Sequence, residues 1–189
     1  LNSLYNVAAV IHQGALLALV PKTHIPNYQE FYEARRFEQA PKENTLTNFN
    51  GQKIPFGTHY VFASTTNSDF KFGVEICEDL WLPDAPSTKL ALNGANLILN
   101  PSASNEITTK SDRRLLVSSQ SARLVCGYVY CNAGNGESTT DVVFSGHHII
   151  SENGTMIKES RGFDSELIYG DLDLKKLSSE RRKKTTFKS

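Results

Sequence analysis

The chain has 189 residues, 39% hydrophobic and 21% charged, a composition that is ordinary for one soluble globular domain. The 20 basic and 20 acidic side chains cancel, which argues against a surface for nucleic acid or a membrane. No apolar run approaches the roughly 20 residues of a membrane span, no secretory signal precedes the fold, and three cysteines form no disulfide framework, so we expect a cytoplasmic protein.

Strands separated by loops are expected in the first half of the chain, over residues 4–11, 15–20, 59–63 and 71–76. The first two flank His12-Gln13-Gly14, which predicts a hairpin. Residues 23–57 are rich in polar, aromatic, proline and glycine residues and predict a long irregular segment, and such segments are often functional.

Helices are expected to alternate with strands in the second half. The predicted helices run from after Pro83 to Asn93 and over 109–125, and the predicted strands are 96–100, 127–132, 141–145, a hairpin over 147–158 around Asn153-Gly154, and 167–172. In the second helix, Leu115, Ser119, Ala122 and Cys126 share one face at helical spacing. Hairpins interleaved with strand–helix–strand units predict an α/β protein with a mixed sheet.

Cys77 follows the predicted strand 71–76 and precedes Glu78-Asp79. The end of a strand projects a side chain out of the sheet, where a nucleophile is needed. For an isolated cysteine, however, a buried structural role is the stronger interpretation. Cys126 and Cys131 fit that structural role, because both lie in or beside an apolar strand.

Histidines offer no local support for a Cys–His pair, whether at His24 or at His147-His148. No Cys/His spacing suggests zinc, so no metal is predicted. The loop with Gly134 and Gly136 lacks the Gly-Lys-Ser/Thr of a phosphate-binding loop and the third glycine of a dinucleotide fingerprint. We interpret it as a tight turn that shapes a pocket.

Lys22 follows the apolar run 15–20 and lies in the loop Pro21-Lys22-Thr23-His24. A lysine can lower the pKa of a nearby thiol and stabilise an oxyanion. This stretch alone still favours a solvated lysine at the end of a strand.

Taken together, four stretches resemble the nitrilase superfamily, and most closely the amino-terminal glutaminase domains of glutamine-dependent NAD synthetases. They are Val20 to Tyr28 with Glu30-Phe31-Tyr32-Glu33, Gly73 to Trp81, Asn100-Pro101-Ser102-Ala103-Ser104, and Gly134 to Asp141. The resemblance spans nearly the whole chain. It implies an α-β-β-α sandwich with a mixed sheet.

The resemblance also implies roles for single residues. Cys77 would be the nucleophile, and Lys22 would stabilise the oxyanion together with the backbone N–H of Glu78. Glu33 would orient the lysine. The positions that match the glutamine pocket are Tyr28, Glu78, Ser104 and Lys110.

The implied reaction converts glutamine to glutamate and ammonia. The ammonia would serve a C-terminal ammonia-dependent NAD synthetase domain, which amidates deamido-NAD at the expense of ATP. ATP and Mg would belong to that domain, and this domain would need no cofactor. The resemblance further implies a homo-oligomer.

Two departures from the family pattern concern the general base and the synthetase motif. The base is a glutamate in a Pro-Glu-Leu-type motif well before the lysine, but none of the 21 residues before Lys22 is Glu or Asp. The Ser-Gly-Gly-type pyrophosphate loop is absent too. We therefore expect a partial glutaminase domain over 1–175, incomplete at its N-terminus, a basic helix or linker over 176–189, and little activity of this chain alone.

Two alternatives remain at this stage. The chain could belong to another nitrilase-type amidase, such as an ω-amidase or carbamoylase, although the Glu-Ser-Thr-Thr-Asp run and the Glu-Phe-Tyr-Glu loop argue against it. It could also be a non-catalytic assembly fragment, an interpretation that rests on the missing base.

Overall fold

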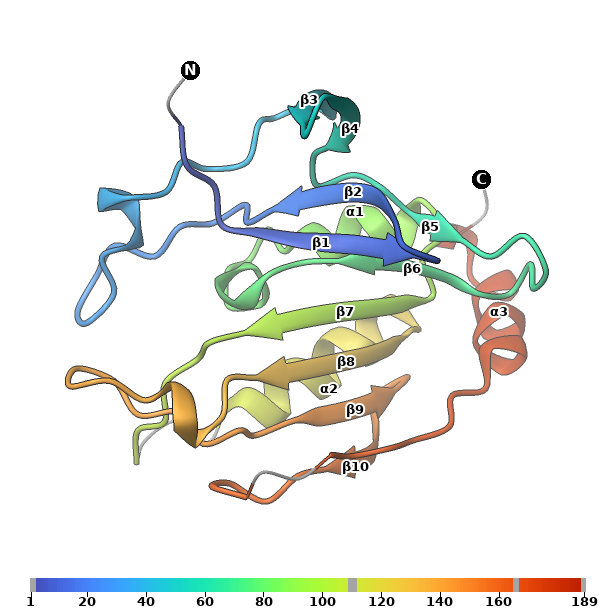
Figure 1. The fold of residues 1–189 in the computed structure, drawn as a ribbon. Helices are drawn as coiled ribbons and strands as arrows, with labels where there is room; N and C mark the ends of the chain where they lie inside the picture. Colours follow the sequence, from blue (N-terminus) through green and yellow to red (C-terminus); the bar gives the residue numbers. More distant parts are fainter. Residues whose placement is uncertain (1–2, 109–111, 165–166, 188–189) are drawn as a thin grey trace.

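The computed structural model describes residues 3–108, 112–164 and 167–187. Two β-sheets lie face to face, and helices pack on the outer face of the larger one (Figure 1). The smaller sheet has the order β1-β2-β4-β3 and the larger β10-β9-β8-β7-β6-β5. Both sheets mix parallel and antiparallel pairs, as predicted. The described residues thus form a sheet–sheet–helix arrangement, three layers of the expected four.

The bounds of the elements are as follows. The smaller sheet contains β1 (Val7–His12), β2 (Ala15–Pro21), β3 (Thr45–Phe49) and β4 (Gln52–Phe56). The larger contains β5 (Phe62–Ala63), β6 (Lys71–Val74), β7 (Leu97–Ser102), β8 (Gly127–Asn132), β9 (Ile149–Glu152) and β10 (Thr155–Glu159). The helices are α1 (Pro86–Leu92), α2 (Asp112–Leu124) and α3 (Leu174–Arg182), with short 3₁₀ turns at Glu33–Arg35, Cys77–Leu80, Asn135–Glu137 and Thr185–Phe187.

Apolar side chains fill both interfaces between the layers. Val10 and Val20 of the smaller sheet pack against Val74 between the two sheets. On the other face of the larger sheet, Ile98 and Val117 belong to a cluster that includes residues of α1, α2 and three strands. Full burial of one such side chain stabilises the fold by about 1.5–3 kcal/mol, so these two interfaces hold the layers together.

The hairpin β3–β4 corrects the prediction that residues 23–57 are irregular throughout. Asn50 and Gly51 both have positive φ, 49° and 80°, the conformation of a two-residue hairpin turn. Asn153-Gly154, the predicted turn between β9 and β10, has the same conformation. The sequence therefore does carry a two-residue turn signal at Asn50-Gly51. The exposed strand β3 beside it lacks the apolar alternation that would have predicted a hairpin there.

Two predicted strands, 141–145 and 167–172, are not strands in the structure. In the first, side chains take over the backbone donors: Thr139 Oγ1 accepts from the N–H of Asp141 at 3.2 Å, and Ser138 Oγ accepts from that of Phe144 at 3.0 Å. In the second, Leu167 and Tyr169 are exposed, and the segment pairs with no strand of the described sheets.

The buried face of α2 differs from the prediction. Leu115 is 66% exposed, whereas Arg113, Val117, Gln120, Ser121 and Leu124 are buried. The polar members of this face have internal partners: Gln120 donates to Ser87 Oγ at 2.9 Å, and Ser121 donates to the carbonyl of Cys126 at 2.7 Å. Hydrophobic spacing identifies a buried face only when that face is apolar.

Helix α3 lies at the edge of the molecule opposite the carboxyl ends of β7 and β8 (Figure 1). Arg181, in the segment predicted as a basic helix or linker, is buried, and its guanidinium donates to the carbonyls of Leu124 at 2.7 Å and Val125 at 2.9 Å. It thereby satisfies carbonyls that α2 leaves without partners at its C-terminal end. The structural role predicted for Cys126 and Cys131 fits only Cys126, since Cys131 is exposed. None of the described helices is both long and apolar enough to span a membrane.

Candidate catalytic pocket

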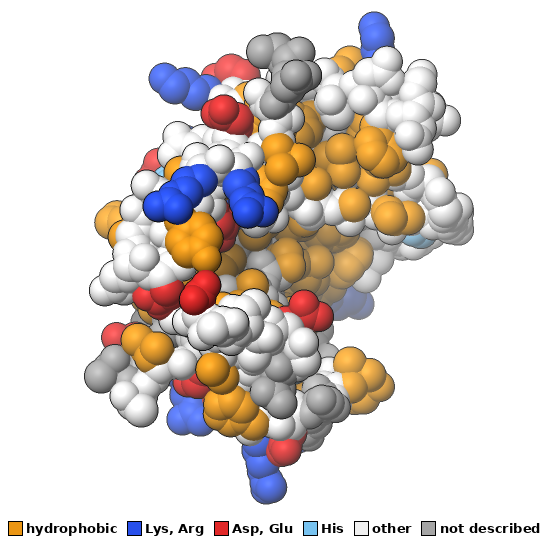
Figure 2. All heavy atoms as spheres, turned by 60° about the vertical axis from the view of Figure 1, so that its left-hand side comes forward, with side chains coloured by type: hydrophobic (Ala, Val, Ile, Leu, Met, Phe, Trp, Pro, Cys, Tyr) orange, Lys and Arg blue, Asp and Glu red, His pale blue; other side chains and the backbone are white. Residues whose placement is uncertain are grey.

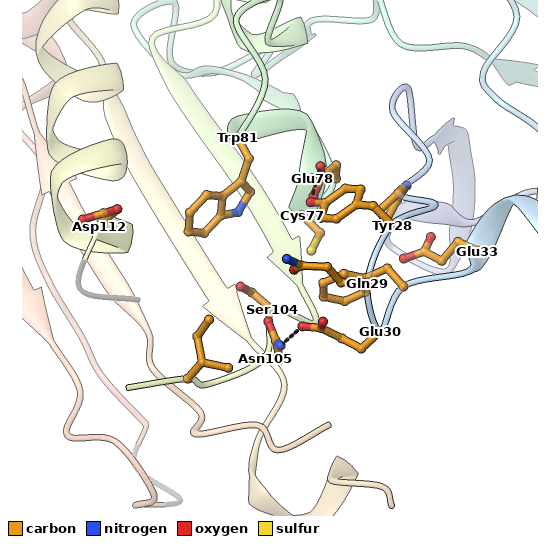
Figure 3. Close-up of a pocket in the computed structure, with 13 residues that line it drawn as sticks. Tyr28, Gln29, Glu30, Glu33, Cys77, Glu78, Trp81, Ser104, Asn105 and Asp112 are labelled. Carbon is orange, nitrogen blue, oxygen red and sulfur yellow. Dashed lines mark hydrogen bonds between the residues drawn. The ribbon is translucent and has the colours of Figure 1, made fainter. Parts of the chain in front are cut away.

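A pocket of about 250 Å³ opens where β6, β7 and β8 end. These strands are parallel, so their carboxyl ends meet at one edge of the sheet. The lining includes Tyr28, Glu30, Glu33, Cys77, Glu78, Trp81, Ser104, Asn105 and Asp112 (Figure 3). On this side the molecule is hollowed, with apolar side chains in the depression and acidic ones at its border (Figure 2). A water molecule occupies about 30 Å³, so the pocket has room for a molecule the size of an amino acid.

The Cys77 backbone turns sharply at the edge of the pocket. β6 ends at Val74, and a 3₁₀ turn begins at Cys77 itself, whose φ is 49°. A non-glycine residue in this left-handed region is strained and persists only when its surroundings hold it. The backbone N–H of Cys77 donates to Asn100 Oδ1 at 2.9 Å. The strained turn presents the thiol to the pocket in the way expected of a nucleophile.

A buried chain of polar groups supports Asn100 from behind. Its Nδ2 donates to the Tyr128 hydroxyl at 3.0 Å, and that hydroxyl donates to the Glu75 carboxyl. The second Glu75 oxygen accepts from the backbone N–H of Ser87 at 2.7 Å. Burial raises the pKa of Glu75 to about 7, although the bonds from Tyr128 and Ser87 lower it. The chain links Cys77 to β8 and α1.

Lys22 is almost fully buried, with 1% of its surface exposed, at the end of β2. Its Nζ donates to both oxygens of Glu33, at 2.8 and 3.0 Å. A buried ammonium needs such a partner, because an unpaired charge in the interior is costly. Asn6 donates to the same carboxylate at 3.4 Å. Glu33 therefore holds Lys22 in one orientation, the role that the resemblance implies for it.

The Cys77 thiol has a raised pKa. Burial raises it, the nearby Lys22 ammonium opposes the rise, and the Glu33 carboxylate adds to it. The protonated thiol is therefore the resting form at neutral pH, and catalysis requires a group that accepts its proton. Glu33 is poorly suited to that task, because both of its oxygens are bound by Lys22.

Asp79 joins the lysine loop to the cysteine turn. Its carboxylate is buried and accepts from the backbone N–H of His24 at 2.8 Å and from that of Ile76 at 2.9 Å. Burial raises the pKa of Asp79, while these backbone donors lower it. One side chain thus connects the residues next to Lys22 with the residue before Cys77.

Alternate residues of the loop after Pro26 reach across the ends of the parallel strands. Tyr28 donates to Glu78 Oε1 at 2.8 Å, Glu30 accepts from Asn105, and Tyr32 donates to Asp141 at 3.1 Å. Burial and the neighbouring Glu78 raise the pKa of Tyr28, so its hydroxyl stays a donor. The loop forms one wall of the pocket and carries Glu33 beneath it.

Ser104 lies on the opposite wall. Its N–H donates to Asn132 Oδ1 at 2.8 Å, and its carbonyl accepts from Asn132 Nδ2 at 2.9 Å. Lys110, predicted to bind substrate, lies outside the described residues. No three His, Cys, Asp or Glu side chains within residues 3–108, 112–164 and 167–187 gather as a metal site, and the prediction of a metal-free domain stays a prediction.

The fold therefore brings six predicted residues to one place. Cys77, Glu33, Tyr28, Glu78 and Ser104 line the pocket, and Lys22 and Cys77 both line an adjoining cavity of about 270 Å³. The sequence did not identify Asp79, Asn100 or Glu30 as part of the site. All three residues lie within the stretches that carry the family resemblance, but only their hydrogen-bond partners reveal what they do.

Comparison with known proteins identifies the family of this chain. The family model for carbon-nitrogen hydrolases matches residues 2–182. The glutamine-dependent NAD(+) synthetase of Mycobacterium tuberculosis is 43% identical over 189 residues, which cover 98% of this chain and 28% of that protein. The chain thus spans little more than a quarter of the curated relative that it matches.

Solved structures of related proteins have a similar fold. A glutamine-dependent NAD(+) synthetase from Cytophaga hutchinsonii superposes with a TM-score of 0.72 at 29% identity, over 86% of this chain and 26% of that one. Saccharomyces cerevisiae Nit3, a member of branch 10 of the nitrilase superfamily, superposes with a TM-score of 0.73 over 98% of this chain and 59% of that one. At 22% identity, the likeness to Nit3 concerns the fold alone.

Proposed function

Because this chain belongs to the carbon–nitrogen hydrolase family, we propose that it is a glutaminase unit that releases ammonia from glutamine for NAD synthesis. The proposal takes glutamine as the substrate and an ammonia-dependent NAD synthetase domain as the recipient of the ammonia. That domain would amidate deamido-NAD with ATP and Mg, and the glutaminase unit would use no cofactor. The 43% identity to a glutamine-dependent NAD(+) synthetase supports this assignment.

One observation carries the chemistry: Lys22, oriented by Glu33, lines a cavity together with Cys77, which also faces the substrate-sized pocket. The Cys77 sulfur attacks the side-chain amide carbon of glutamine, and a carbon–sulfur bond forms. The Lys22 ammonium and the Glu78 backbone N–H stabilise the oxyanion. The carbon–nitrogen bond then breaks, and protonated nitrogen leaves as ammonia. Water cleaves the thioester and releases glutamate.

The proton transfers need a carboxylate that takes the thiol proton and returns it to the leaving nitrogen. Such a group contributes about 10²–10⁴-fold to the rate. Lys22 already binds both oxygens of Glu33, so we assign this task to a carboxylate outside the described residues. The cavity lined by Asn6, Lys22, Cys77 and Ser102 is the place where it would reach the thiol.

The pocket also fits the two charged groups at the far end of glutamine. Glu30 and Glu78 provide negative charge for an α-ammonium group, and Tyr28 and Ser104 provide hydroxyls. We keep Lys110, as the resemblance implies, as a further contact, since its ammonium would suit the α-carboxylate. An ω-amidase or carbamoylase would act on other amides, so a panel of amide substrates separates these functions.

Replacement of the nucleophile tests the proposal. In the complete natural form of the protein, Cys77→Ala should reduce ammonia release from glutamine by at least about 10³-fold. Cys131→Ala is the matched control, because Cys131 is exposed and does not line the pocket, and it should keep full activity. Wild-type protein that hydrolyses another amide but no glutamine, or full activity of Cys77→Ala, would overturn the assignment.

We further propose a cytoplasmic location and a homo-oligomeric state. All three cysteines are free, and a reducing compartment keeps thiols in that state. Light scattering on the purified protein measures the mass in solution, and the mass of a single chain would contradict the proposed oligomer.

A further inference from the structure

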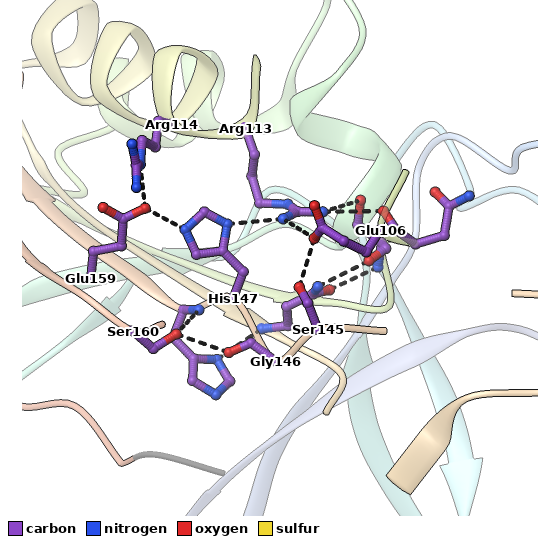
Figure 4. A network of polar contacts seen from close by, with 12 residues as sticks. Glu106, Arg113, Arg114, Ser145, Gly146, His147, Glu159 and Ser160 are labelled. Carbon is purple, nitrogen blue, oxygen red and sulfur yellow. Dashed lines mark hydrogen bonds and ion pairs between the residues drawn. The ribbon is translucent and has the colours of Figure 1, made fainter. Parts of the chain in front are cut away.

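Arg113 projects from the first turn of α2 into the protein beside the catalytic pocket (Figure 4). Only 1% of its surface is exposed, which makes it the largest fully buried side chain in the described part of the protein. A buried guanidinium is costly unless carboxylates and hydrogen-bond acceptors surround it. Its partners therefore indicate what this position achieves.

On one side, Arg113 contacts the wall of the pocket. Its Nη2 donates to the carbonyl of Asn105 at 3.2 Å and approaches Ser104 Oγ at 3.5 Å. Ser104 and Asn105 both line the pocket, and Asn105 also donates to Glu30 on the opposite wall. The guanidinium thus contacts the segment that carries the predicted substrate residue Ser104.

On the other side, Nη1 of Arg113 donates to Glu106 at 3.0 Å and lies 2.9 Å from His147 Nδ1. Burial alone would raise the pKa of Glu106, but the bonds from Ser145 and Arg113 outweigh it and lower the pKa. Glu106 therefore stays ionised and neutralises the arginine.

The tautomer of His147 follows from these contacts. Arginine has no acceptor, so Nδ1 of His147 must accept from Arg113. The ring proton then sits on Nε2, which donates to the Glu159 carboxylate. Glu159 also accepts from Arg114, whose side chain is 64% exposed. A neutral His147, held by Glu159, supplies the acceptor that orients the guanidinium.

We propose that Arg113 is a positioning residue that holds Ser104 and Asn105 in place for substrate binding, and that His147 and Glu159 hold Arg113. The inference rests on the proposed glutaminase function. Arg113 does not line the pocket itself and acts through the segment that it binds. Its loss should raise KM for glutamine far more than it lowers kcat, because the thiol and Lys22 stay in place.

Kinetics of four variants in the complete natural protein test this. Arg113→Lys keeps the positive charge but loses the planar guanidinium, whose two terminal nitrogens bind partners on opposite sides. It should raise KM about tenfold or more, while kcat changes less than about threefold. His147→Ala should raise KM by a smaller factor. His147→Gln should bring KM back from the value of His147→Ala to near that of wild type. Its carboxamide carries an acceptor oxygen for Arg113 and a donor nitrogen for Glu159. Arg114→Gln, the matched control on the exposed side of Glu159, should leave KM unchanged.

Hydrogen exchange supplies a readout that does not depend on glutamine. In Arg113→Lys, the backbone amides of residues 104–106 should exchange faster, and those of residues 77–79 should not. If Arg113→Lys does not fold, the pair His147→Ala and His147→Gln carries the same comparison. Unchanged KM and unchanged exchange in an active enzyme would overturn the inference. A wild-type protein without glutaminase activity would instead refute the proposed function, while faster exchange at 104–106 would still support the positioning role.

Discussion

At the scale of single residues, the chemistry of the pocket depends on two opposing effects at Cys77. Burial raises the thiol pKa, and the Lys22 ammonium lowers it. The same ammonium is held by both oxygens of Glu33, so it cannot turn away from the site without losing its partner. In the proposed mechanism, Lys22 would therefore lower the thiol pKa before attack and stabilise the oxyanion after it.

Replacement of Lys22 by methionine isolates the first of these effects. Without the ammonium, which lowers the pKa of Cys77, that pKa should rise further. Alkylation of Cys77 by iodoacetamide at about pH 7 should then be roughly tenfold slower, since only the thiolate reacts. The rate measured against pH should shift toward higher pH. Lys53→Met, on the exposed face of β4, is the control, and a pH profile identical to wild type in Lys22→Met would exclude this role.

At the scale of elements, the site is built from several separate segments, and in each case a single side chain links one segment to another. Asp79 links the loop after β2 to the turn after β6, through the backbone N–H groups of His24 and Ile76. Asn100 of β7 holds the Cys77 turn through the backbone N–H of Cys77. Each link satisfies a donor that would otherwise be unpaired in the interior, so each stabilises the fold while it aligns the site.

Asp79→Asn tests the first link. An asparagine offers one acceptor oxygen where the carboxylate offers two, so one buried N–H should lose its partner. We expect the free energy of unfolding to fall by about 1–3 kcal/mol and glutamine hydrolysis to weaken. Urea unfolding measures the first quantity and ammonia release the second. Asp84→Asn makes the same chemical change at an exposed residue nearby, and equal stability losses in both variants would contradict the role of Asp79.

At the scale of the whole molecule, Glu75 is a buried carboxyl between the larger sheet and the helices. It accepts from Tyr128 of β8 and from the N–H of Ser87 in α1. Its pKa rises from an ordinary 4.5 to about 7. Folding therefore favours the protonated form, and the resulting stability is fully present below about pH 4.5 and is lost as the pH rises through about 7.

Glu75→Gln removes this titration. The shift corresponds to about 3 kcal/mol at most, taken as an order of magnitude. Wild-type stability should therefore fall relative to that of Glu75→Gln between about pH 5 and about pH 8, whatever the absolute stability of the variant. Urea unfolding of both proteins at both pH values measures the difference in their free energies of unfolding. The contributions of other titrating groups are the same in both proteins and cancel in this difference. A difference that is constant across this range would show that Glu75 does not titrate there.

Much of the architecture follows from local patterns. The hairpins β1–β2 and β9–β10, the strands β6 to β8 and the helix α2 all appear near their predicted positions, because turn residues and apolar runs act over a few neighbouring residues. The predictions were wrong where side chains replaced the ladder bonds, as at Thr139, or where a hairpin lay among polar residues, as at Asn50-Gly51.

The sequence by itself determined the chemical types at the site: a cysteine after a strand, a lysine at the end of another, and Glu33 in the loop between them. Only the tertiary structure decided which polar side chains support them. Arg113 was placed in a helix but not on its buried face, and its partner His147 lies 34 positions away. Hydrophobic periodicity reports local burial, whereas a buried polar group becomes favourable only when distant segments bring it a partner.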